Sequence, residues 1–214
     1  MPMPIIHLCV AKSLTETLCI RDKANFYLAS IAPDALYRIP TYHDLDFDGM
    51  YERYTAAHLT ENDFNVWRTN VVNFTSSNDE NRDFYTGYGV HILTDTYWKE
   101  DVFSLFMKKC SEIGKSYEES RVIYYNDAEI LDRDFYKSFD LKSDVWGYLA
   151  SCSGFGIDGL VTAEEVHSWK ENTLKLVEGR EDTHNTINYF TYEIMSDFIK
   201  STVVKISKLL KAGQ

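Results

Sequence analysis

The sequence predicts an all-α fold, formed as one domain over residues 1–214. No β-hairpin signal or internal repeat stands out. Only ten Gly and four Pro occur in 214 residues, and 44% of the residues are hydrophobic, which is typical of a compact globular protein. Apolar residues recur at helical spacing, most clearly near the carboxyl end of the chain, where one helix face would carry Ile187, Phe190, Ile194, Phe198 and Ile206.

In the first half of the chain, helices are expected on either side of one irregular connection. The first helix runs from Pro4 to about residue 20, since proline suits a first turn. Two prolines, followed by several Asp residues and Gly49, predict an irregular connection over residues 26–49. Thr60 with Asp63 resembles a cap that opens the next helix. Asp79 opens another, which ends near Trp98.

The second half of the chain contains further helices and one ambiguous segment. Residues 101–113 continue helically, and Gly114 is the expected stop. Residues 116–140 leave two readings open, because "RVIYYND" also fits a short strand. Residues 151–159 form a loop, and a capping-box pattern at Thr162 opens a helix to about residue 177. The last helix begins near residue 183.

Composition limits the kinds of partner and compartment. The net charge of −11 argues against nucleic acid, although bound cations would allow a phosphate-containing substrate. The four cysteines show no CxxC spacing, so neither a disulfide framework nor a zinc ribbon is expected. The start "MPMPIIHLCVAKSLTETL" has no basic leader and no uninterrupted apolar span. We therefore expect a cytoplasmic protein without a transmembrane segment; its oligomeric state is left open.

The apolar stretch "YGVHILTDTYW" carries two polar residues, His91 and Asp95. Four residues apart on a helix, they lie on one face. Burying them without partners is costly, so each needs a hydrogen bond or a metal ion. Two interpretations stand: a core histidine bonded to its neighbouring carboxylate, or a pair of metal ligands.

Three further residues are candidate ligands. His7 lies in a mostly apolar helix, Asp34 follows Pro33 between hydrophobic residues, and His43 lies in "IPTYHDLDFDG". Their structural alternatives are a core histidine, a turn or cap aspartate and a surface histidine. Together with His91 and Asp95 they form a plausible set of N and O ligands for zinc or a similar transition metal.

The order of these elements resembles the bacterial zinc-dependent phospholipase C family and its small relatives. The matching segments are His7, "FYLASIAPD", His43 and "GYGVHILTDTYW", within about residues 5–105. The resemblance implies a helical bundle of that type. It also implies one or two zinc ions, or another divalent metal, which lower the pKa of a water that attacks phosphorus.

Site roles follow from the resemblance residue by residue. Asp34, His43, His91 and Asp95 match the ligands of one metal. His7 matches a ligand of a second metal, which Asp95 bridges. Asp34 matches the residue that orients or deprotonates the attacking water, and is therefore the catalytic candidate.

The chain departs from the family at a third metal site. The family has a histidine where this chain has Asp101, and its later His-x3-Glu pair is matched here only by His167 and Glu171, much farther along. A site for one or two metals is therefore expected. The substrate implied is a small phosphoester or a phospholipid head group.

Two other features have simpler explanations. Residues 44–55 begin like a calcium loop, but the twelfth position is Thr55 where a bidentate Glu is needed. His58 and His184 are flanked by polar residues and are expected at the surface or at helix caps. The main hypothesis is a metal-dependent phosphoester hydrolase. The alternative is a non-catalytic helical protein with a structural metal or polar-core cluster, acting by partner binding.

Overall fold

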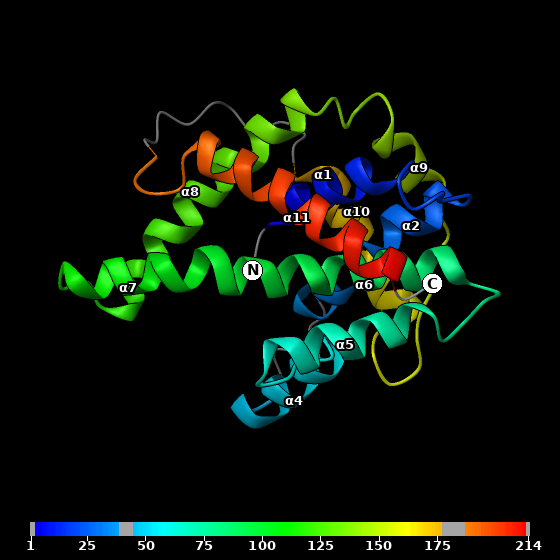
Figure 1. Cartoon of the computed structure of the whole chain (residues 1–214), viewed down its shortest axis with the longest axis horizontal. Helices are drawn as coiled ribbons and strands as arrows, with labels where there is room; N and C mark the ends of the chain where they lie inside the picture. The colour runs from blue at the N-terminus through cyan, green and yellow to red at the C-terminus, as the bar shows by residue number, and fades with distance from the viewer. Residues whose placement is uncertain (1–2, 39–44, 177–186, 213–214) are drawn as a thin grey trace.

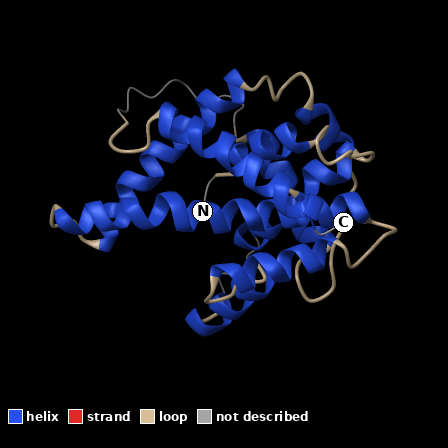
Figure 2. Ribbon diagram, viewed as in Figure 1, coloured by secondary structure: helices blue, strands red, loops and turns tan. Residues whose placement is uncertain are grey.

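The computed structural model describes residues 3–38, 45–176 and 187–212, and within these ranges the regular structure is helical (Figures 1 and 2). One isolated β-bridge joins Ile157 and Val161. The all-α prediction is confirmed for the described chain. The helices are α1 (Pro4–Leu14), α2 (Lys23–Ala29), η1 (Ala32–Arg38), α4 (Phe47–Ala57), α5 (Phe64–Thr75), α6 (Arg82–Trp98), η2 (Lys99–Phe103), α7 (Ser104–Glu112), α8 (Tyr117–Ser138), α9 (Val145–Ser151), α10 (Ala163–Lys175) and α11 (Tyr192–Ala212).

Helix α6 is the central helix of the molecule. It contacts α1, α2, α5, α11 and η1, and it crosses the middle of Figure 1 in green. Every residue from Thr86 to Trp98 is buried, which explains why apolar side chains occur on all faces of this segment. Its polar side chains are satisfied locally where they can be: the hydroxyls of Thr94 and Thr96 donate to carbonyls one turn back.

Two glycines allow neighbouring helices to approach α6 closely. A Cβ on Gly87 would lie 2.3 Å from the carbonyl oxygen of Phe26 on α2. A Cβ on Gly89 would lie 2.2 Å from the Thr75 side chain at the end of α5. Both positions therefore need glycine for close packing of helices, a role that no turn or cap signal reveals.

The segment expected to be irregular, residues 26–49, is helical over much of its length, so that prediction was wrong. Asp22 caps α2 by accepting from the amide of Asn25, and residues 26–29 are buried. Pro33 then lies in the first turn of η1, where a missing N–H costs little. Residues 39–44 lie outside the described chain.

Helix α1 is shorter than predicted. It ends at Leu14, and the chain then turns through Cys19, which has a positive φ of 54°. The turn is fixed by side-chain contacts, because the Thr15 hydroxyl donates to the carbonyl of Lys12 and contacts the Tyr27 hydroxyl. A left-handed residue other than glycine gives no signal in the hydrophobic pattern.

The short-strand reading of residues 116–140 was also wrong, because this segment forms the long helix α8. Ser116 and Glu119 make a reciprocal capping box at its start. The buried residues recur every three or four positions, at Tyr124, Asp127, Leu131 and Phe135. Burial of that face decides for helix over the strand preference of "VIYY".

Other end signals behave as expected. Gly114 adopts a positive φ of 74° and stops α7. Asp63 accepts from two amides at the start of α5, and Thr162 makes a capping box with Glu165 at the start of α10. The helix carrying His91 opens at Asn81 and not at Asp79.

The calcium-loop pattern does not form such a loop where it is described. Residues 47–57 are the helix α4, and Asp46 is its N-cap, accepting from the amide of Gly49. Asp48 lies in the first turn of the helix. The last helix begins at Tyr192, and the predicted start near residue 183 lies outside the described residues. The prediction that Ile187 and Phe190 lie on this helix was wrong: residues 187–191 are not helical, and the amides of residues 188–190 donate to the Asp127 carboxylate. None of the helices in the described ranges is long and apolar enough to cross a membrane.

Candidate metal centre

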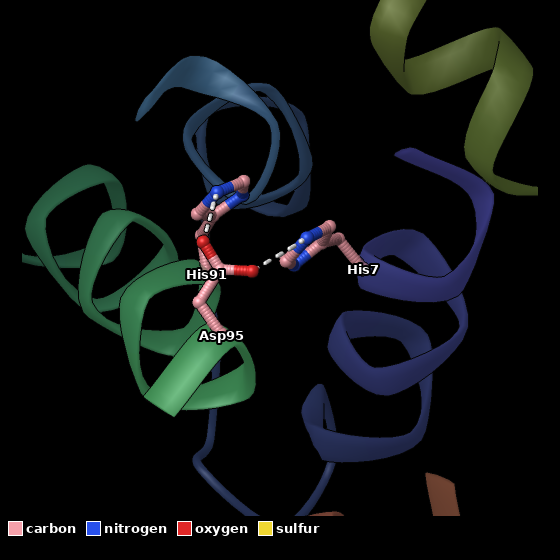
Figure 3. Close-up of side chains that lie close together, drawn as sticks. All are labelled: His7, His91 and Asp95. Carbon is pink, nitrogen blue, oxygen red and sulfur yellow. Dashed lines mark ion pairs between the residues drawn. The ribbon is translucent and has the colours of Figure 1, made fainter. Parts of the chain in front are cut away.

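Five buried side chains from four segments meet beside α6. His7 comes from α1, Asp34 from η1, His58 from the C-cap of α4, and His91 and Asp95 from consecutive turns of α6. All five are at most 5% exposed. Figure 3 shows three of them, with His7 approaching the Asp95 carboxylate from α1. Two groups of three residues have ligand atoms within 4.8 Å of one another: His7, His91 and Asp95, and Asp34, His58 and His91.

The distances between these atoms exceed ordinary hydrogen bonds. The Nε2 atom of His7 lies 3.4 Å from Asp95 Oδ1, and that of His91 lies 3.5 Å from Asp95 Oδ2. An N–H···O hydrogen bond is usually about 2.7–3.2 Å long. Two ligand atoms each about 2.1 Å from a tetrahedral ion are about 3.4 Å apart. The observed spacing therefore fits atoms that share an ion better than atoms that bond each other.

The same spacing recurs on the other side of the cluster. His58 Nε2 lies 3.4 Å from Asp34 Oδ1 and 3.7 Å from Asp95 Oδ2. His91 Nε2 lies 3.9 Å from Asp34 Oδ1. The rings of His7 and His91 are stacked, with centroids 3.8 Å apart. The five side chains thus form one continuous cluster.

The facing atoms have no hydrogen-bond partner. These buried atoms are both ring nitrogens of His7, Oδ1 of Asp34, Nε2 of His58, Nε2 of His91 and both carboxylate oxygens of Asp95. An unpaired polar atom in the protein interior costs about 1–3 kcal/mol, and so many together need a common partner. In the part of the chain that is described, no lysine or arginine pairs with either carboxylate. One divalent cation would balance their two negative charges.

Backbone carbonyls orient two of the imidazoles. His91 Nδ1 lies 2.8 Å from the carbonyl oxygen of Ser30, and His58 Nδ1 lies 3.1 Å from that of Tyr54. A carbonyl only accepts, so we assign the proton of each ring to Nδ1. Each Nε2 then turns a lone pair toward the cluster, which is the arrangement of metal-binding histidines.

The charges of the cluster shift its titration. Burial, followed by the neighbouring His91, lowers the pKa of His7. Burial also lowers the pKa of His91, but the Asp34 and Asp95 carboxylates outweigh it and raise the pKa overall. Burial raises the pKa of Asp95, and the adjacent His91 and His7 reverse this, so that its pKa lies well below the usual range. Asp95 is therefore ionised at neutral pH, as a ligand must be.

His58 was expected at the surface or at a cap, and the structure overturns the first part of that expectation. It is the C-cap residue of α4, yet it is fully buried and directed into the cluster. The following Leu59 has a positive φ of 48°. Its amide donates to the carbonyl of Ala56, and the amide of Thr60 donates to the carbonyl of Thr55, which forms a Schellman-type turn. The usual glycine signal is absent, and the polar flanking residues gave no sign of burial. His43, the predicted loop ligand, lies outside the described residues.

The candidates for a third site are not brought together. Asp101 pairs with Lys205 at 2.5 Å, and His167 lies on the exposed side of α10. Glu171 lies 3.3 Å from Lys170. Within the described ranges, the groups that could hold an ion are confined to the five-residue cluster.

The residues present fit a transition-metal ion. Zinc, iron and manganese bind imidazole nitrogens and carboxylate oxygens, and the cluster offers three imidazoles and two carboxylates. The ligand atoms lie close together and have no hydrogen-bond partners. The two groups of three residues share His91, whose free Nε2 has one lone pair and binds one ion, so a second ion would have to be held without His91. Four of the five predicted ligands lie in the cluster, namely His7, Asp34, His91 and Asp95.

Comparison with known proteins adds no relative. No family model, curated protein sequence or solved structure matches the chain. The interpretation of the cluster therefore depends on its own geometry.

Proposed function

We propose that the protein is a metal-dependent hydrolase of phosphoesters, with one or two zinc or similar divalent ions held by His7, Asp34, His58, His91 and Asp95. The observation that supports this most directly is the convergence of buried nitrogen and oxygen atoms that lack hydrogen-bond partners. Five ligand side chains exceed the four that a single closed tetrahedral site uses. The fifth ligand side chain therefore supports a catalytic site over a closed, four-ligand structural site.

A bound divalent ion would polarise the phosphoester and lower the pKa of a water molecule. Asp34 is the side chain of this chain best suited to orient that water or take its proton. Its side chain is 7% exposed, against 2% or less for the other four. His91 and His58 are held by backbone carbonyls, so their Nε2 atoms stay aimed at the site without rearrangement during the reaction.

The resemblance to the zinc-dependent phospholipase C family supports a phosphoester as the substrate class. The candidates are a small phosphodiester and a phospholipid head group. His58, which the resemblance did not imply as a ligand, lies beside Asp34, with its Nε2 atom 3.4 Å from Asp34 Oδ1. With His58, the cluster in the described part of the chain contains three histidines and two aspartates.

The alternative function is a non-catalytic helical protein in which the cluster holds a structural metal and the surface binds a partner. The near-complete burial of all five side chains favours this alternative, because structural sites are closed. The two functions differ in their response to Asp34→Asn. In an enzyme, the change abolishes turnover and leaves the fold intact; in a structural site, it acts through stability alone.

The first experiment is metal analysis of untagged protein by elemental mass spectrometry, with His91→Ala/Asp95→Ala as the test variant. The matched control is His167→Ala, which removes an exposed imidazole outside the cluster. We expect one or two equivalents of divalent metal in the wild type and in the control, and loss in the test variant. A phosphodiesterase screen on bis(4-nitrophenyl) phosphate follows, with Asp34→Asn as the inactive variant.

Two results would contradict the proposal. Absence of stoichiometric metal after reconstitution would make the cluster a polar core. Stoichiometric metal combined with no turnover on any phosphoester, and a large loss of stability on chelation, would establish the structural alternative.

A further inference from the structure

A pocket of about 200 Å³ adjoins the candidate metal centre. It lies between α4, η2, α7 and the first half of α8. Pockets for whole drug-sized ligands usually measure about 300–1,000 Å³, so this one has room for a single chemical group. Its wall is mainly aromatic and includes Tyr54, Phe103, Phe106, Tyr117, Tyr124 and Tyr125.

The pocket has a buried floor and an accessible rim. Phe106 and Tyr124 are at most 6% exposed and form the floor. Tyr117 and Tyr125 are 58% and 49% exposed, one turn before and one turn after Arg121 on α8. A ligand can therefore enter from solvent and meet ring faces on several sides. Aromatic walls of this kind favour a planar group through stacking.

The charge of the pocket is opposite to that of the protein. Among the described residues that line the pocket, Arg121 is the one that is charged, and none is a carboxylate. The guanidinium lies over the rings of Tyr117 and Tyr125, at 6.0 and 5.6 Å from their centroids, which holds it at the rim. Within the described chain, no carboxylate forms an ion pair with it. In a protein of net charge −11, this pocket is a local site for an anion.

Tyr54 joins the pocket to the metal centre. Its ring lines the pocket and stacks on the ring of His58, with centroids 4.2 Å apart. The carbonyl of the same residue orients His58 through Nδ1. The pocket and the cluster therefore share one wall, and a group bound in the pocket is adjacent to the site where the proposed reaction takes place.

We propose that this pocket binds a planar aromatic group that carries a negative charge, and that this group is part of the substrate. The second half of the proposal rests on the proposed function. The ring stacks between the tyrosines, and the anion pairs with Arg121 through charge-assisted hydrogen bonds. The substrates are then phosphoesters of anionic aromatic groups. A cationic lipid head group is disfavoured, because the guanidinium repels it.

Binding is tested first without any chemistry. Benzenesulfonate is titrated into the wild type and into metal-free His91→Ala protein, and the affinity is measured by nuclear magnetic resonance. Ethanesulfonate lacks the ring and benzyl alcohol lacks the charge, so each should bind at least fivefold more weakly. Arg121→Gln should weaken benzenesulfonate binding about tenfold. Lys108→Gln is the matched control, since it removes a positive charge from α7 outside the pocket, and it should change nothing.

The outcomes separate the pocket from the proposed reaction. If the wild type and Arg121→Gln bind benzenesulfonate with equal affinity, or if neither binds it, the proposed anion-binding site is refuted. In turnover of an anionic aryl phosphodiester, Arg121→Gln should raise KM about tenfold and leave kcat unchanged. If no variant turns over any phosphoester but benzenesulfonate binding depends on Arg121, the binding site is supported and the hydrolase is refuted.

Discussion

Substituting Gly87 with alanine tests the packing that positions the metal cluster. A Cβ at this position would lie 2.3 Å from the Phe26 carbonyl oxygen and 3.0 Å from the Ala29 Cβ, both on α2. Ordinary van der Waals contact begins near 3.4 Å. Because a backbone carbonyl cannot rotate away as a side chain can, α2 must move from α6 by about 1 Å.

The cost of this movement can be estimated from the contacts it loosens. A gap of up to about 1 Å loses a quarter to a half of the dispersion attraction across the interface. Overpacking typically costs about 1–3 kcal/mol, and alanine recovers up to about 1 kcal/mol of helix propensity. We expect a net loss of about 1 kcal/mol. For a chain of this length, Tm then falls by about 2–4 °C.

The same movement should weaken metal binding. Ser30 directly follows α2, and its carbonyl oxygen lies 2.8 Å from Nδ1 of His91. His91 lies on α6, one turn after Gly87. Separating the helices lengthens this contact and frees the imidazole to rotate. Loss of such a supporting hydrogen bond typically lowers metal affinity about 10–100-fold. The affinity is measured by competition with a chromogenic chelator.

Gly147→Ala is the matched control for the stability measurement. Gly147 lies within α9, and no atom lies within 4 Å of the position of its Cβ. This variant should be more stable than the wild type by about 0.5–1 kcal/mol. Thermal unfolding of metal-free protein is followed by circular dichroism. A Tm for Gly87→Ala equal to or above that of the wild type would refute close packing of α2 on α6.

Three other predictions concern the metal, a buried carboxylate and a buried hydroxyl. Chelation should lower Tm by about 8–16 °C, since a ligand at 1,000 times its Kd contributes about 4 kcal/mol; the fall should be absent in His91→Ala. Burial raises the pKa of Asp127, but amide donors of residues 188–190 outweigh this and lower it. The ionised Asp127 therefore adds to the free energy of unfolding above the unfolded-state pKa of about 3.9, and this contribution is lost as the pH falls through the lowered pKa of the folded state. Asp127→Asn should reduce the fall in the free energy of unfolding at acid pH. Tyr88→Phe leaves the buried Ala57 carbonyl unpaired and should cost about 1–3 kcal/mol in denaturant unfolding; an unchanged midpoint would contradict the 2.7 Å hydrogen bond.

Much of the fold could be predicted from the sequence because its signals are local. The apolar stretch ending at Trp98 indicated α6, although its start is at Asn81 and not at Asp79. The caps at Asp63 and Thr162 depend on residues within one turn. The errors have a tertiary cause. The segment "RVIYYND" has strand preference, but its Tyr124 and Asp127 belong to the buried face of α8. Residues 26–29 form a helix that packs against α6.

The same distinction applies to the cluster. His91 and Asp95 are one turn apart on one helix, so their proximity follows from spacing alone. The placement of His7 and Asp34 beside them was proposed from a resemblance, and the structure brings the four side chains together. His58 could not be found, because its burial depends on a left-handed leucine at the end of α4 and on packing against distant segments.

The distribution of the five side chains over α1, η1, α4 and α6 has a consequence for the order of folding. Only His91 and Asp95 are neighbours in an unfolded chain, and bringing residue 7 to residue 95 requires closure of a long loop. An ion captured early would have two ligands, so tight uptake follows the docking of α1 on α6. Release of a bound ion would then require α1 and α6 to part, and the residence time of the ion would be set by the rate at which these buried helices separate.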